Sequence, residues 1–333
     1  MKMPGSLRRL FAMAACFAAS ASAQQQRYTP PQHSAPPPPG ITRSTPEEIV
    51  AQADGGTQIE RDRPARHALA EHRRLARALA TLAPQRKGVI DAYVLSVALD
   101  SDPVFGREAR EAGKVLARRY DGAGRTIVLG GSEGSAPSAL PMGSPQNFEA
   151  ALARIAELMD PAEDVLVLYT TSHGAPFGVV YNDGNEGFGA ISPARLSRLF
   201  DALGIQRRLL IVSACYSGVF VPVLSGPQTA IFSAASSDRS SFGCMAENDW
   251  TFFGDAMINH ALRKPQPLAA AAKQAVALIQ QWEQQGDLKP SLPQQSIGVE
   301  VSTWLIPLEA RIPRVATAPV GRPSIDSLDD LDR

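Results

Sequence analysis

Short apolar runs that alternate with helical segments constrain the fold of this chain more than any other feature. Residues 165–170 form an uninterrupted run of strand-forming residues, and similar runs occupy residues 89–99, 126–129, 209–212 and 229–234. Strands without a polar face are typical of sheets that are covered on both sides. Helical spacing fills the intervals at residues 107–120, 146–159 and 193–203, and recurs at 250–262 and 267–282. The alternation predicts an α/β fold with three layers, in which a mostly parallel central sheet of about six strands carries helices on both faces. Residues 298–306 are expected to add the last strand.

The first 23 residues have the features of a targeting signal. Basic residues precede an apolar run at residues 10–19, which ends in Ala21, Ser22 and Ala23. Cleavage after Ala23 would make the protein exported, either periplasmic or secreted. A second interpretation stays open, namely a lipoprotein signal with Cys16 as the acylated residue after the small residues Ala14 and Ala15.

Composition divides the rest of the chain into four parts. Residues 24–46 form a linker rich in Pro and Gln, and residues 47–85 form an N-terminal helical segment. The main domain is expected at residues 86–310, followed by a flexible tail at 311–333 that is rich in Pro, Ser and Asp.

Charge and hydropathy exclude two classes of partner. The 33 basic and 33 acidic residues cancel, so no overall field would gather nucleic acid. Every apolar stretch after the N-terminus is shorter than the roughly 20 residues that span a bilayer as a helix. Removal of the signal leaves Cys215 and Cys244, too few for the disulfide framework of a small secreted protein.

Two strand ends are followed by residues that are suited to nucleophilic catalysis. The run at 165–170 is followed by His173 and Gly174, and the run at 209–212 is followed by Cys215. Sites in open α/β sheets form beyond the carboxyl ends of the strands, so parallel neighbours would place His173 beside Cys215. An imidazole next to a thiol favours the thiolate, which is the attacking species. The backbone N–H groups of Gly174 and Cys215 could form the oxyanion hole.

Spacing alone leaves a simpler interpretation open, with Cys215 as a buried thiol and His173 as a loop residue. No cofactor or metal is expected. His67 and His72 do not share a helix face, and residues 182–186 lack the ligand spacing of a calcium loop, so a turn between two short strands is expected there. Cys244 is interpreted as a structural thiol.

The apolar runs before His173-Gly174 and Ala214-Cys215 resemble those of the legumain family of cysteine peptidases, the asparaginyl endopeptidases, which are relatives of the caspases. Residues 240–244 resemble the family's Ser-Ser-Tyr-x-Cys segment, and Gly254-Asp255 resembles its Gly-Asp. The resemblance implies a caspase-like fold and a substrate pocket formed by Arg107, Ser240 and Asp255. Ser172 and Tyr216 depart from the family, because many members have acids at these positions.

The expected function is therefore that of an exported cysteine endopeptidase acting on peptide or protein substrates through a Cys215–His173 dyad and an acyl-enzyme. Cleavage after Asn or Asp is implied by the resemblance alone. The alternative from another class is a catalytically silent caspase-like domain that binds peptides or partner proteins.

Overall fold

The computed structural model describes residues 44–131 and 138–328. The expected signal sequence with Cys16, and the linker up to residue 43, lie outside the described residues.

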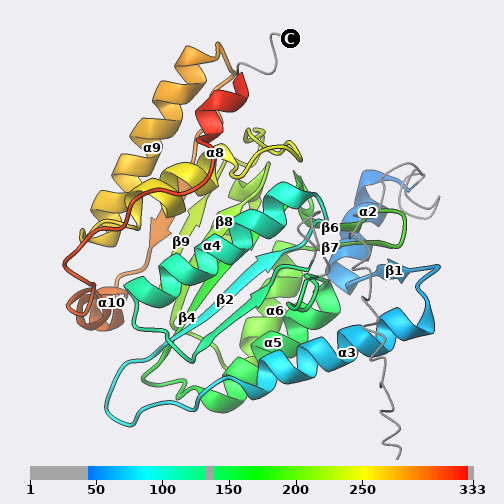
Figure 1. Ribbon diagram of the computed structural model, residues 1–333, viewed down its shortest axis with the longest axis horizontal. Coiled ribbons are helices and arrows are strands. Elements are labelled where there is room, and N and C mark those ends of the chain that lie inside the picture. The colour runs from blue at the N-terminus through cyan, green and yellow to red at the C-terminus, as the bar shows by residue number, and fades with distance from the viewer. Residues whose placement is uncertain (1–43, 132–137, 329–333) are drawn as a thin grey trace, which may run out of the picture.

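A six-stranded sheet forms the centre of the molecule, in the order β10-β9-β8-β4-β2-β3 (Figure 1). Five strands are parallel and only β10 is antiparallel to its neighbour; the strands are β2 (Ala92–Ala98), β3 (Thr126–Leu129), β4 (Val165–Thr171), β8 (Arg208–Ser213), β9 (Thr229–Ser233) and β10 (Gln294–Ile297).

Helices cover both faces of this sheet, which confirms the predicted three-layer α/β fold. On one face α4 (Pro103–Arg119) and α9 (Leu268–Gln285) pack against residues such as Val94 and Val167. The opposite face is covered by α5 (Pro145–Leu158) and α6 (Pro193–Leu203), which bury Leu95 and Leu168. Because successive residues of β2 and β4 are buried in different cores, these strands have no polar face.

A small second sheet lies beside the carboxyl edge of the large one, in the order β1-β7-β6-β5. It consists of β1 (Gln58–Glu60), β5 (Gly174–Ala175), β6 (Gly178–Asp183) and β7 (Gly187–Ile191). The turn expected at residues 182–186 joins β6 to β7. The N-terminal segment is not wholly helical, because β1 separates α2 (Pro46–Gly55) from α3 (Ala65–Ala80) and pairs with β7.

The strand predicted at residues 298–306 is wrong. Residues 294–297 supply the last strand, whereas much of the run 298–306 lies in helix α10 (Ser302–Glu309), which buries Trp304 and Leu308. The helix expected at 250–262 begins at Thr251, whose side chain accepts a hydrogen bond from the Gly254 N–H. It continues through α8 (Phe252–Gly254) into the π-helical turn η2 (Asp255–Ala261).

The tail expected to be flexible is instead bound to the domain as far as residue 328. The indole N–H of Trp250 donates to the carbonyl of Val320 at 2.8 Å, and the Val320 N–H donates to Asn259 Oδ1 at 2.9 Å. The backbone N–H of Ser324 donates to Asp255 Oδ2 at 2.7 Å. Polar groups of the domain therefore hold a segment whose composition favours an irregular chain.

None of the described helices is both long enough and apolar enough to cross a membrane.

Candidate active site

Strands β4 and β8 bring His173 and Cys215 to one edge of the sheet. The strands are parallel neighbours in which Thr171 lies opposite Ser213, and each candidate residue lies two positions beyond this pair. The loops that follow them touch, because a Cβ atom added to Gly174 would lie 1.9 Å from the carbonyl oxygen of Cys215. Only glycine permits this approach of the two backbones, so Gly174 keeps His173 close to the thiol.

A sharp turn follows Cys215. Tyr216 has φ 58°, in the left-handed region that side chains rarely occupy, and its N–H donates to the carbonyl of Arg239 at 2.8 Å. The turn directs the half-buried Cys215 thiol toward the loop of residues 239–244, where the Ser241 N–H lies 3.3 Å from Sγ. The strained backbone at Tyr216 thus fixes the position of the Cys215 thiol.

The surroundings of Cys215 favour its thiolate. A hydrogen bond with the Cys244 thiol lowers the pKa of Cys215, while partial burial raises it. The Ser241 N–H, the nearby charge of His173 and the Ser240 hydroxyl lower it further, so the pKa of Cys215 falls to about 6. A thiol with this pKa is largely ionised at neutral pH, unlike an ordinary cysteine with a pKa of about 8.5.

His173 has a carboxylate partner that the sequence analysis did not identify. Its Nε2 lies 3.5 Å from Oδ2 of Asp102, and this hydrogen bond raises the pKa of His173 against the opposing effect of burial. The Phe105 ring packs edge-on against the imidazole with 5.1 Å between centroids. Asp102 precedes α4, and its N–H donates to Asp100 Oδ1 at 2.9 Å. The imidazole is therefore held on two sides by the start of α4.

Asp100, Asp102 and His173 each offer a ligand atom, and these atoms lie within 4.8 Å of one another. The hydrogen bond between His173 and Asp102 accounts for the approach of these two residues. The cluster has the composition that a positioned catalytic imidazole requires.

The expected pocket residues are not all brought together. Arg107 donates to the carbonyl of Asn248 at 3.2 Å and pairs with Asp249 at 3.1 Å. Asp255 has no exposed surface and accepts instead from Asn259 and from the Ser324 N–H. Asp249 is the carboxylate that accompanies Arg107.

One loop connects this ion pair to the nucleophile. Ser240 is exposed and its hydroxyl hydrogen-bonds Cys215, while Asn248 and Asp249 of the same loop hold Arg107. The Arg107 side chain keeps about a third of its surface exposed, at 30%. The guanidinium of Arg107 and the carboxylate of Asp249 are thus both partly exposed to solvent.

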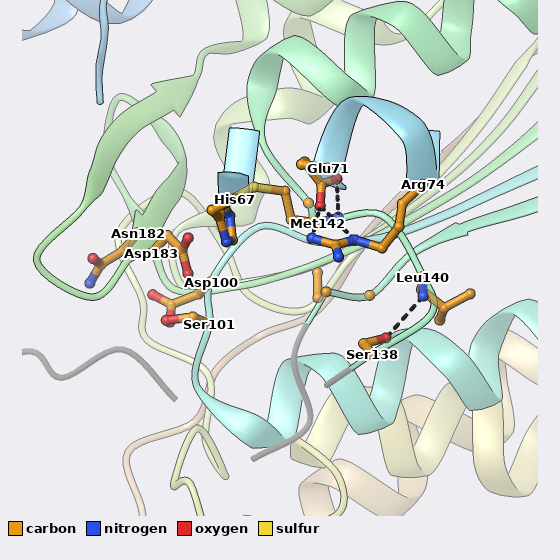
Figure 2. Close-up of a pocket in the computed structure, with 14 residues that line it drawn as sticks. His67, Glu71, Arg74, Asp100, Ser101, Ser138, Leu140, Met142, Asn182 and Asp183 are labelled. Atoms are coloured by element: carbon orange, nitrogen blue, oxygen red, sulfur yellow. Dashed lines mark hydrogen bonds and ion pairs between the residues drawn. The ribbon is translucent and has the colours of Figure 1, made fainter. Parts of the chain in front are cut away.

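A separate pocket opens on the other side of Asp100, with a volume of about 190 Å³. Figure 2 shows that α3 contributes His67, Glu71 and Arg74 to its wall, near Asp100 and Ser101. Glu71 fixes this helix to the domain, because its carboxylate accepts from the Met142 N–H at 2.8 Å and from the amide of Asn147 at 2.9 Å. The N-terminal segment is therefore part of the surface beside the sheet edge that carries His173 and Cys215.

Residues 145–299 match the model of the Peptidase C13 family. The match supports a cysteine-type peptidase. The matched segment contains His173, Gly174, Cys215 and Ser240, whereas Asp102 and Arg107 precede it. No curated protein matches the sequence significantly.

Among solved structures, the chain is similar to caspase-1 from Spodoptera frugiperda, with 13% sequence identity and a TM-score of 0.40. The similarity covers 62% of this chain and 85% of that chain. Strands β2 and β3 and helix α4 lie before the C13 match, yet they complete the sheet and supply the partner of His173.

Proposed function

We propose that this cysteine-type peptidase is an exported endopeptidase in which Cys215 is the nucleophile and His173 its acid and base. The observation that carries the proposal is the contact between the Gly174 and Cys215 backbones, which joins the two strand ends that bear the histidine and the thiol. Export rests on the signal-like residues 1–23.

The chemistry follows from the two protonation states. The Cys215 thiolate attacks the scissile carbonyl, and the His173 imidazolium donates its proton to the leaving amine. The neutral imidazole then takes a proton from water, which hydrolyses the thioester. The N–H groups of Gly174 and Cys215 are the proposed donors to the oxyanion of each tetrahedral intermediate. Asp102 acts through His173, since its carboxylate orients the ring and stabilises the imidazolium.

The first experiment measures alkylation and peptide cleavage on the same preparation. Cys215 should react with iodoacetamide along a pH curve centred near pH 6, following its lowered pKa. Cys215→Ala and His173→Ala should each lower kcat by roughly 1,000-fold or more. His72→Ala, which removes an exposed histidine on α3, is the matched control and should keep full activity.

A silent binding domain would give a different pattern. In that case peptide cleavage by the wild-type protein would not exceed that of Cys215→Ala, while labelled peptides would still bind. Such a result would overturn the enzymatic proposal and favour the binding domain.

We further propose cleavage after Asn or Asp, with Arg107, Asp249 and Ser240 around the substrate side chain. Arg107 and Asp249 together offer donors and an acceptor to a side-chain carboxamide. Asp255, although expected in this pocket, is buried beneath the C-terminal tail and has its own partners.

A peptide-library digest with matched variants tests this pocket. Arg107→Met should lower kcat/KM for Asn peptides by roughly 10- to 100-fold, because a charge-assisted hydrogen bond is lost. Asp249→Asn should change the preference between Asn and Asp substrates, whereas Asp255→Asn should lower stability without changing that preference. If Asp255→Asn alone altered the preference, the assignment of Asp249 would be wrong.

A further inference from the structure

The second free thiol lies beside the candidate nucleophile. Cys244 hydrogen-bonds Cys215 through its side chain, and both thiols are reduced and partly exposed. The Ser241 N–H, three residues before Cys244, also lies 3.3 Å from Cys215 Sγ. Two contacts from one short segment therefore fix Cys244 near Cys215.

The position of Cys244 is supported on its other side as well. It packs against the apolar cluster of Val104, Phe105 and Ala109 at the start of α4, and Phe105 also contacts His173. Gly243, directly before it, has φ 88°, a conformation that glycine adopts without strain. Glycine at position 243 therefore permits the turn that brings Cys244 to this cluster.

We propose that Cys215 and Cys244 form a reversible disulfide, which switches the peptidase off when the protein meets hydrogen peroxide or a small-molecule disulfide. This inference rests on the proposed function, because it treats Cys215 as the nucleophile. It assigns Cys244 the role of resolving thiol, beyond the structural role expected from the sequence.

Hydrogen peroxide supplies the two-electron oxidation that a disulfide between Cys215 and Cys244 requires. The Cys215 thiolate attacks one oxygen of hydrogen peroxide, which forms a sulfenic acid and releases hydroxide. The Cys244 sulfur then attacks the Cys215 sulfur, a disulfide bond forms, and the sulfenic oxygen leaves as water after it takes the Cys244 proton. The two thiols lose two electrons and the peroxide gains them. With a small disulfide, Cys215 first forms a mixed disulfide, and Cys244 displaces the second thiol.

The environments of the two thiols support this order. The pKa of Cys244 is raised by its hydrogen bond with Cys215 and by burial, so Cys244 stays protonated while Cys215 is ionised. Cys215 therefore reacts first with the oxidant. Cys244 becomes an effective nucleophile only after the Cys215 charge beside it has been removed.

The test compares the full-length wild-type protein with Cys244→Ser, each treated with hydrogen peroxide and then with dithiothreitol. Peptide mapping of the oxidised wild-type protein should show one bond between Cys215 and Cys244 and a mass lower by two hydrogen atoms. Dithiothreitol should restore most of the wild-type activity, about 80% or more of its own reduced value. Cys244→Ser should recover less than about 20% of its own value, because Cys215 proceeds to sulfinic acid.

Oxidised wild-type protein in which Cys244 is still a free thiol, or equal recovery by the two proteins, would overturn the switch. Far-ultraviolet circular dichroism of Cys244→Ser establishes that the variant is folded. The mass readout does not depend on activity, so an inactive protein that still forms the bond would contradict the proposed function and leave the thiol pairing established.

Discussion

Asp102, the residue directly before α4, favours the protonated state of His173. Its carboxylate hydrogen-bonds His173 and is the largest cause of the raised pKa of this imidazole, with Asp100 and Cys215 acting in the same direction. A higher pKa for His173 and a lower one for Cys215 widen the pH range in which the imidazolium–thiolate pair is present. The expected kcat/KM profile therefore rises near pH 6, as Cys215 ionises, and falls as His173 loses its proton.

Asp102→Asn tests this positioning role. The amide keeps the shape of the side chain but removes its charge, so the pKa of His173 should fall and the alkaline limb of kcat/KM should move to lower pH. We also expect kcat to fall by roughly 10-fold, because the imidazolium is less stabilised. Asp201→Asn, on the exposed face of α6, should leave the profile unchanged. An unmoved alkaline limb in Asp102→Asn would show that the carboxylate has no effect on His173.

Residues at strand ends could be found from the sequence, because parallel strands place them together. His173 and Cys215 are examples. Asp102 could not be assigned in this way, since its role depends on the direction in which α4 leaves β2. Asp249 was missed because the loop of residues 240–250 has no regular spacing, and the family resemblance pointed to Asp255.

At the scale of elements, a buried carboxylate joins α4 to the sheet. Glu108 on α4 is fully buried; it accepts from the Tyr169 hydroxyl on β4 and from the Thr251 N–H at 2.7 Å. Gly254 leaves room for it, because an added Cβ would lie 2.2 Å from its Oε2. The network fixes α4, which carries Arg107 and directly follows Asp102, against the strand that leads to His173.

Burial makes the network sensitive to pH. Desolvation raises the pKa of Glu108 above its ordinary value of 4.5, against the effect of its hydrogen bonds. The folded protein thus favours the protonated acid, and the stability linked to this group is present below the unfolded pKa and lost as pH rises through the folded one. Glu108→Gln mimics the neutral acid, so its melting temperature relative to wild type should increase between about pH 4 and about pH 8. A decrease over that range would mean that Glu108 is more stable ionised when folded.

Whole elements were predictable where apolar spacing was long and regular. The buried strands β4 and β9 and the helix α6 lie close to their expected limits. Strand β1 was not predicted because its three residues are too few to show an alternation of apolar and polar side chains. Its pairing partner β7 also lies far along the chain. Helix α10 was mistaken for a strand because its apolar residues, including Trp304, suit either structure.

At the scale of the molecule, the domain that folds is longer than the segment that matches the family. The C13 match at residues 145–299 leaves out β2, which lies between β3 and β4 in the sheet. It also leaves out the tail that binds Trp250, Asn259 and Asp255. Composition suggested a free tail because its own residues have little apolar surface, and the polar groups that bind it belong to the domain.

Truncation measures what the tail contributes. A protein that ends at Arg314 loses the partner of the Trp250 indole and a donor to the buried Asp255 carboxylate. We expect the free energy of unfolding to fall by roughly 3 kcal/mol in urea denaturation, since buried polar groups lose their partners. A protein that ends at Leu328 keeps these contacts and is the control. Equal stability of the two truncated proteins would show that the tail contacts contribute nothing.

The inner position of β4 and β8 has a consequence for the energetics of substrate binding. Each strand is hydrogen-bonded on both sides, β4 by β2 and β8, and β8 by β4 and β9. The backbones that lead to His173 and Cys215 are thus ordered before any peptide arrives. The conformational entropy of these strands is lost when the protein folds, so it does not reduce the free energy of peptide binding. The loop of residues 239–250 lies outside the described helices and strands, so a bound peptide can order it further. Amide hydrogen exchange in β4 and β8 should then be equally slow in the free enzyme and in its complex with a covalent peptide inhibitor, while exchange in that loop slows.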